Sequence, residues 1–193
     1  VKLNGGTLTT KGINYGPHAY LSSLTGLFFN GTLIRANQDN PAFLSFSGGD
    51  FTAPVVQSGG ARIDTNGFAI TLGLGLTGPG ALTKSGAGTL TLSGTHSYNG
   101  GTTLSGGTGF DTLRLTGGTS LDLLKISNAA AMGIDETSHI EGMERIDMAT
   151  DTAANMLKIS NKDINDMAGF NQIHTGSASE DGKTWTNVSG TAL

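Results

Sequence analysis

The chain has 193 residues, of which 31 are glycine and none is cysteine, and its formal net charge is −4. The lack of cysteine excludes disulfides and thiol chemistry, and the acidic balance excludes a general nucleic-acid-binding surface. No apolar run reaches the roughly 20 residues of a membrane-spanning helix. Charged residues make up only 13% of the chain, which is typical of a Gly-, Thr- and Ser-rich β-structure rather than of a helical globule.

The two halves of the chain differ in charge. Residues 1–110 contain 5 Lys/Arg and 3 Asp/Glu, a balance of +2, whereas residues 111–193 contain 6 and 12, a balance of −6. We therefore divide the chain into a Gly/Thr-rich β-region over 1–109 and an acidic β-region over 110–193. Because Val1-Lys2-Leu3-Asn4 already has the pattern of a strand and a turn, we expect the chain to be a segment of a larger protein.

Asn-Gly turns punctuate the first half, at Asn4-Gly5, Asn30-Gly31, Asn66-Gly67 and Asn99-Gly100. Their spacings are irregular, at 26, 36 and 33 residues, which suits a solenoid whose coils carry outward loops of different length. Asn-Gly is also the strongest short signal for an antiparallel hairpin. The hairpin alternative therefore remains open at this point.

The stretch from Leu82 to Leu115 consists of short strands and tight turns. Thr89-Leu90-Thr91-Leu92 alternates polar and apolar residues with period two, as half-buried strands do. Gly-rich groups separate the strands, and too few residues lie between them for a crossover helix. Both a meander of hairpins and a parallel solenoid fit this pattern. Upstream, Phe28-Phe29 is predicted to enter the core.

The second half contains an internal repeat. Leu124-Lys125-Ile126-Ser127-Asn128 returns as Leu157-Lys158-Ile159-Ser160-Asn161, 33 residues later, and each copy is predicted to be a strand followed by a polar cap. Ser160 or Asn161 is predicted to cap a short helix that runs through Met167 and ends at Gly169. Asn128 is predicted to start a corresponding turn, and Trp185 to lie in a final hairpin.

Two segments resemble known families. Leu82–Gly94 followed by Tyr98–Thr103 resembles the passenger-associated repeat of bacterial autotransporters, and the likeness extends over about 1–108. It implies a right-handed parallel β-helix outside the cell, acting as a spacer rather than an enzyme. The segment over about 110–176, with Ile140–Met148 at its centre, resembles very large repeat adhesins exported by type I systems. The expected fold class is thus all-β, a parallel β-solenoid with short helical segments in the C-terminal half.

One motif suggests a metal. Gly106–Arg114 fits the nonapeptide G-G-x-G-x-D-x-U-x, in which Gly107, Gly109 and Asp111 would help bind Ca²⁺. A complete site needs oxygens from a second stacked copy, and the next turn lacks the Gly-x-Asp spacing. The alternative is a turn in which Asp111 hydrogen-bonds its own backbone.

Other polar groups carry weaker signals. Five acidic residues cluster in the sequence: Asp135, Glu136, Glu141, Glu144 and Asp147. They are expected to form a solvated face, and the alternative is a Ca²⁺-binding or catalytic cluster. The histidines do not show metal-ligand spacing, and we expect surface positions for all four: His18, His96, His139 and His174. The sequence contains neither a nucleophile-elbow motif nor a phosphate-binding loop.

These observations favour an extracellular structural or adhesive module: a stiff solenoid of a bacterial surface adhesin or biofilm-matrix protein. We expect end-to-end self-association into fibres, because neither terminus shows an evident polar cap, and contact with cell-surface or matrix polysaccharide. The alternative is a polysaccharide-active β-helix enzyme or its binding module. We do not expect enzymatic activity, nucleic-acid binding or any cofactor apart from Ca²⁺.

Overall fold

The computed structural model consists mainly of short strands, and most of them pair with the corresponding strand of the coil before them. It describes residues 1–15, 26–46, 53–125, 139–167, 174–178 and 184–187. The predicted turn at Asn128, the acidic residues Asp135 and Glu136, and His18 lie outside these ranges.

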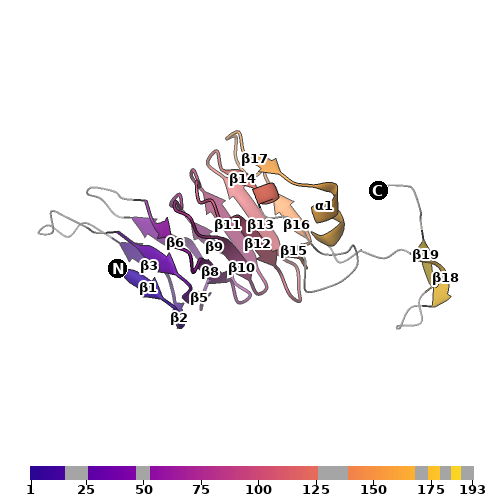
Figure 1. Ribbon diagram of the computed structural model, residues 1–193, viewed down its shortest axis with the longest axis horizontal. Helices are drawn as coiled ribbons and strands as arrows, with labels where there is room; N and C mark the ends of the chain where they lie inside the picture. The colour runs from indigo at the N-terminus through magenta and orange to yellow at the C-terminus, as the bar shows by residue number, and fades with distance from the viewer. Residues whose placement is uncertain (16–25, 47–52, 126–138, 168–173, 179–183, 188–193) are drawn as a thin grey trace, which may run out of the picture.

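The coils add strands to the second and third sheets in the same order along the whole stack, and the first three coils also add a strand to the first sheet (Figure 1). The first sheet contains β1 (Lys2–Asn4), β4 (Phe28–Asn30) and β7 (Val55–Val56). The second contains β2 (Thr7–Thr10), β5 (Leu33–Ala36), β8 (Ala61–Asp64), β10 (Leu82–Ser85), β12 (Thr102–Ser105) and β15 (Ile140–Glu141). The third contains β3 (Ile13–Tyr15), β6 (Asn40–Phe46), β9 (Ile70–Leu72), β11 (Thr89–Ser93), β13 (Thr112–Thr116) and β16 (Arg145–Asp147).

Every ladder in these three sheets is parallel, and this decides between the two architectures that the sequence left open. A meander of hairpins would pair successive strands antiparallel, whereas here β2 pairs with β5 and β10 with β12, one coil apart. The chain therefore forms an all-β parallel solenoid, as expected. Only the terminal pair β18 (His174–Ala178) and β19 (Thr184–Asn187) is antiparallel among the named strands, which confirms the predicted hairpin around Trp185.

The register between neighbouring strands stacks apolar residues of successive coils above one another, and these columns form the core. In the third sheet, Leu44, Leu72, Leu92 and Leu115 follow one another in a single column, all of them buried. In the first sheet, Leu3, Phe29 and Val56 are aligned, and Phe29 is 2% exposed. The period-two alternation of the sequence thus becomes a continuous apolar interior, because alternate residues of every strand point inward.

Glycine is required at the corners because successive coils stack backbone on backbone there. At Gly80, a Cβ atom would overlap the carbonyl oxygen of Gln57 one coil below, and at Gly100 it would overlap the backbone of Gly80. Hydrogen bonds between the corners confirm the close approach: Gly80 N donates to Val56 O at 2.9 Å, and Gly100 N donates to Gly80 O at 3.1 Å.

Coil length varies, and the extra residues fall between strands rather than within the ladders. Residues 20 apart are paired between β10 and β12, since Leu82 pairs with Thr102, and Leu104 pairs with Ile140, 36 residues later. Both of these pairs lie in the same sheet. Coils of unequal length therefore stack into one regular ladder. Part of the irregular Asn-Gly spacing has another cause, because Asn30 ends β4 whereas Asn66 lies at a different corner, after β8.

The internal repeat is only half confirmed. Leu157 and Lys158 lie in β17 (Met156–Lys158), which pairs with β14 (Ser120–Asp122), but Leu124 and Lys125 lie in the 3₁₀ turn η1 (Leu123–Lys125). The prediction of a strand at 124–128 is wrong for residues 124 and 125, because β14 ends before them. Asp122 Oδ1 accepts a hydrogen bond from Leu124 N at 3.0 Å, a local contact that favours a turn over a strand.

A helix lies against the last strand of the second sheet. Helix α1 (Asn161–Met167) follows β17, at the point where the next coil would add a strand beside β15. Ser160 Oγ accepts from Asp163 N at 3.1 Å, and Asp163 Oδ2 accepts from Ser160 N at 2.9 Å, the reciprocal pattern of a capping box. The prediction of a capped helix here is confirmed. Met143 N also donates to Met167 O, which holds α1 against this end of the stack (Figure 1).

Candidate functional site: a buried polar corner

A lysine interrupts the apolar column inside the second sheet. Along this column the register places Ile34, Ile63, Lys84, Leu104 and Ile140 one above another. All five are buried, and Lys84 is 0% exposed. Burial of an ammonium group in an apolar setting is costly unless it is paired, so the partners of Lys84 mark the chemically distinctive place in the fold.

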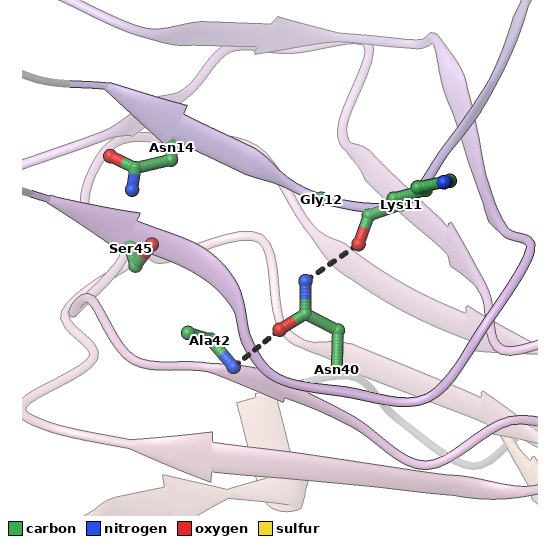
Figure 2. A pocket seen from close by; sticks show the side chains of 6 residues that line it. All are labelled: Lys11, Gly12, Asn14, Asn40, Ala42 and Ser45. Carbon is green, nitrogen blue, oxygen red and sulfur yellow. Dashed lines mark hydrogen bonds between the residues drawn. The ribbon is translucent and has the colours of Figure 1, made fainter.

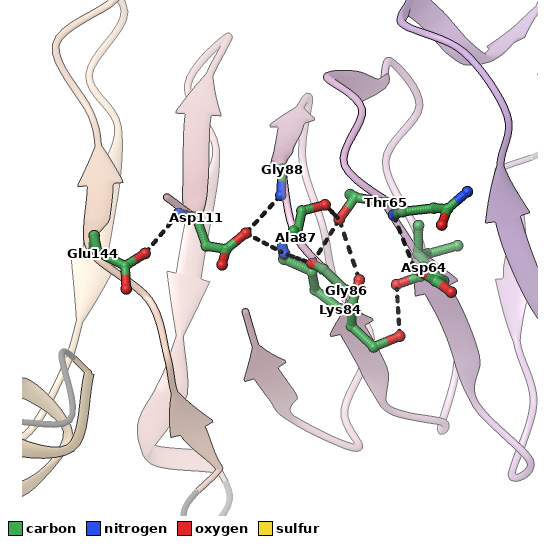
Figure 3. A network of polar contacts seen from close by, with 11 residues as sticks. Asp64, Thr65, Lys84, Gly86, Ala87, Gly88, Asp111 and Glu144 are labelled. Carbon is green, nitrogen blue, oxygen red and sulfur yellow. Dashed lines mark hydrogen bonds and ion pairs between the residues drawn. The ribbon is translucent and has the colours of Figure 1, made fainter. Parts of the chain in front are cut away.

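The amine of Lys84 is directed towards the corner between the second and third sheets (Figure 3). Lys84 Nζ donates a hydrogen bond to Gly86 O at 2.6 Å. It also lies 3.9 Å from Oδ1 of Asp111, which belongs to the next coil and is itself 0% exposed. The two side chains therefore form a fully buried pair that joins neighbouring coils.

Asp111 is held between two coils. Its Oδ1 accepts a hydrogen bond from Gly88 N at 2.6 Å, and its own backbone N donates to Glu144 Oε2 at 2.6 Å. Figure 3 shows Asp111 between Glu144 on one side and Gly88 and Lys84 on the other. Its second oxygen, Oδ2, is buried without a hydrogen-bond partner. The carboxyl group is thus positioned by one oxygen, and the other oxygen is unsatisfied.

The backbone at Gly106 packs closely against this carboxyl group. A Cβ atom on Gly106 would overlap Gly142 O and lie 2.7 Å from Asp111 Oδ2. Glycine is therefore required at position 106 so that the coil that contains Asp111 can close over its own side chain.

Burial shifts both members of the pair towards their neutral forms. It lowers the pKa of the Lys84 ammonium, an effect that the negative charges of Asp111, Asp64 and Glu144 oppose. It raises the pKa of Asp111, an effect that the Gly88 N–H and Lys84 oppose and Glu144 reinforces.

The preceding coil supplies a polar layer next to this pair. Arg35 Nε donates to Asp64 Oδ2 at 2.7 Å, and Asp64 Oδ1 accepts from Asn66 N at 2.9 Å. Thr65 is fully buried, and its Oγ1 lies within hydrogen-bonding distance of the carbonyl oxygens of Ser85, Gly86 and Ala87. These bonds fix the turn whose Gly86 carbonyl accepts from Lys84.

The residues predicted to bind calcium are only partly brought together. Gly107 and Gly109 have φ angles of 83° and 117°, so the turn uses glycine as the motif requires. Asp111 does not bond its own backbone in the described contacts but accepts from Gly88 in the preceding coil. No group of three or more His, Cys, Asp or Glu in the described part of the chain could hold a metal ion. Calcium binding stays a prediction. The Lys84 ammonium group lies beside Asp111, in the position that a bound cation would need.

Two histidines expected at the surface are buried, so that expectation is wrong for both. His96 is 9% exposed and His139 is 6% exposed. His96 Nδ1 accepts from Leu76 N at 3.2 Å, and the ring packs edge-on against Tyr98 with centroids 6.2 Å apart. Burial lowers the pKa of His96 to about 4. His139 Nε2 lies 3.0 Å from Oδ1 of Asp163 in α1, so it connects the helix to the start of β15.

The acidic cluster is not a uniformly solvated face. Asp147 is 8% exposed, and its Oδ2 accepts from Arg114 Nε at 3.1 Å and from Arg145 Nη2 at 2.7 Å. Glu144 accepts from the backbone of Asp111. These carboxylates are used to join β13 to β16, so the expectation of a solvated face is wrong for Asp147.

A shallow polar pocket of about 320 Å³ lies on the first two coils, far along the chain from the buried pair. Its lining consists of Lys11, Gly12, Asn14, Asn40, Ala42 and Ser45 (Figure 2). Asn40 bridges its wall, because Nδ2 donates to Lys11 O at 2.6 Å and Oδ1 accepts from Ala42 N at 2.8 Å. None of these lining residues is a carboxylate, so the pocket does not offer the acid–base pair that glycoside hydrolysis requires.

Lys84 was not predicted to be a buried polar residue, although the sequence contained the signal for it. In Leu82-Thr83-Lys84, the lysine has the same parity as the buried Leu82, and period two places it on the inner face. Its partner Asp111 was singled out, but for a different reason, because sequence spacing does not show which residues stack across coils.

The comparisons agree with the fold of the central coils. The family model described as the passenger-associated-transport-repeat matches residues 82–108, which contain β10, β11 and β12. No curated protein and no solved structure matches the chain. In the part of the chain that the structure describes, helices are too short and too polar to cross a membrane. The chain thus carries an autotransporter-linked passenger repeat, a structural repeat and not an enzymatic one, which implies a surface-exposed or extracellular protein.

Proposed function

We propose that this chain is a stiff spacer segment of an extracellular bacterial surface or matrix protein, which holds an adhesive or matrix-binding part away from the cell. The observation that carries the proposal is the unbroken six-strand parallel ladder from β2 to β15. Each coil adds one strand to that ladder and about 4.8 Å of length. Polar corners and glycine contacts between coils fix each coil on the last, so that length is gained without flexible joints.

The spacer role predicts a characteristic response to force. Thr7→Cys and Thr83→Cys, in a chain with no cysteine of its own, allow the three coil lengths between these positions to be pulled along the stack. Thr7, Leu33, Arg62 and Thr83 are aligned, so the coils between them contain 26, 29 and 21 residues by subtraction. We expect no extension until abrupt steps of about 70 to 100 Å, one coil each, at about 3.4 Å per residue. Gradual lengthening at low force would contradict the spacer role.

The alternative function, a polysaccharide-active enzyme, has less support in the described residues. The polar pocket does not contain a carboxylate, and the buried Asp111 does not face solvent. We expect no release of reducing ends or unsaturated products from common polysaccharides. Release of either product would replace the spacer role with an enzymatic one. End-to-end self-association and polysaccharide binding stay predictions, and the position of α1 against β15 weighs against addition of a further strand there.

A further inference from the structure

We propose that Lys84 and Asp111 form an intramolecular isopeptide bond, an amide between Lys84 Nζ and Asp111 Cγ that covalently joins two neighbouring coils. The starting observation is that Lys84 stands where the neighbouring coils have an isoleucine or leucine in the same column, and that its buried partner is Asp111 of the next coil. A buried ion pair in such a position contributes little stability compared with apolar residues. An amide would replace two buried charges with one neutral group.

The geometry provides the reacting groups. Lys84 Nζ lies 3.9 Å from Asp111 Oδ1, with both side chains 0% exposed, so bulk water is kept from the site. Gly88 N donates to Oδ1 at 2.6 Å, which polarises that C–O bond and would stabilise the negative charge that develops on Oδ1 as the amine attacks. Oδ2 has no hydrogen-bond partner and is the oxygen free to depart.

Formation of the amide needs no external reagent. A proton moves from the Lys84 ammonium to the Asp111 carboxylate, which leaves a neutral amine and a carboxylic acid. The amine nitrogen bonds to Cγ, its remaining extra proton passes to the departing hydroxyl group on Oδ2, and the Cγ–Oδ2 bond breaks. The products are an amide and one water molecule, and nothing is oxidised or reduced. Burial favours the neutral forms of both groups, as their pKa shifts indicate.

Fixed neighbours would hold the two groups in reacting positions. Gly86 O accepts from Lys84 Nζ at 2.6 Å, and Thr65 holds the turn that contains this carbonyl. Glu144 holds the backbone of Asp111 at 2.6 Å. The coils therefore bring amine and carboxyl together as part of folding, which converts a reaction between separate molecules into an intramolecular one.

The test is the intact mass of the purified 193-residue chain in denaturant. We expect a mass lower than that of the sequence by one water molecule, together with a branched peptide that joins the Lys84 and Asp111 segments after proteolysis. Asp111→Asn should still form the same amide, with loss of ammonia in place of water. Lys84→Arg should have the full sequence mass.

The controls separate the amide from other dehydrations. A succinimide at Asp111 would also remove one water, but it would persist in Lys84→Arg and would not give a branched peptide. A folded wild-type chain with its full sequence mass and no branched peptide would overturn the proposal, as would a mass loss that survives Lys84→Arg. Neither result bears on the spacer role, which depends on the ladders and not on this bond.

Discussion

Lys84 replaces an aliphatic side chain in the interior of the stack, and its buried partner is Asp111 of the next coil. Each neighbouring coil shows that an aliphatic residue fits at position 84. The pair is therefore not needed for packing, and its stabilising value depends on both partners being present. Removal of one charged partner should therefore destabilise the fold more than removal of both charges.

A second substitution, at Asp111, should restore part of the stability that is lost on substitution of Lys84. Lys84→Leu leaves the Asp111 carboxyl group buried without its cation, and we expect a loss of at least about 3 kcal/mol in the free energy of unfolding. Adding Asp111→Asn removes the charge, keeps an acceptor for Gly88 N and should recover most of that penalty. Neither variant can form the amide, so urea denaturation of the two isolates the buried charge.

A surface pair serves as the control for that comparison. Lys158 Nζ lies 3.3 Å from Asp122 Oδ2 with 55% of the lysine side chain exposed. Lys158→Met should therefore change stability by no more than about 1 kcal/mol. If the double variant is no more stable than Lys84→Leu alone, the penalty does not come from an unpaired charge.

Because His96 is buried, we expect the folded chain to lose stability in mild acid. Its pKa is about 4 in the folded chain and about 6.5 when unfolded, so between these values the unfolded chain binds more protons. Stability is then complete above pH 6.5 and falls as the pH drops towards 4, by about 2 kcal/mol at pH 5. His96→Asn keeps an acceptor for Leu76 N and should abolish this part of the pH dependence. Equal pH dependence in both chains would show that His96 is not responsible.

At the scale of elements, the corners determine how closely coils stack. The strands supply alternation, which the sequence shows directly. The pattern of Leu82–Leu115 fitted hairpins as well as a solenoid, and its resemblance to the passenger-associated repeat favoured the solenoid. The helix α1 was predictable as well, because the capping pattern around Ser160 is local. The Lys84–Asp111 contact was not, because it depends on the register between coils, and insertions of unequal length hide that register in the sequence.

Gly80 provides a test of the stacked corners. Gly80→Ala would drive a methyl group into Gln57 O of the adjoining coil, and we expect a loss of more than about 3 kcal/mol, because the obstacle is backbone that cannot rotate away. Gly67→Ala is the matched control: its φ is +87°, but nothing lies within 4 Å of the added atom. It should cost only about 1 kcal/mol of backbone strain. Thermal or urea unfolding measures both, and equal losses would show that coil contact at the corner is not the limiting factor.

At the scale of the whole molecule, a ladder that adds one strand per coil should lengthen by one step for each coil inserted. Residues 82–101 form one complete coil by register, since Leu82 pairs with Thr102. A second copy placed after Gly101 should therefore insert into the stack without changing its ends. In the first copy Lys84→Ile restores the apolar column, so that only the lysine beside Asp111 remains.

The most direct measurement is the distance between spin labels on Thr7→Cys and Thr103→Cys, determined by pulsed electron paramagnetic resonance. The chain has no native cysteine to interfere, and the two positions belong to one column, through Leu33, Arg62 and Thr83. Four interstrand steps separate the two backbones by about 19 Å. For a stack of coils we expect a narrow distance distribution, which shifts by about 4.8 Å and stays narrow when the extra coil is present. An unchanged distance, or a broad distribution after insertion, would contradict a stack of coils that grows one strand at a time.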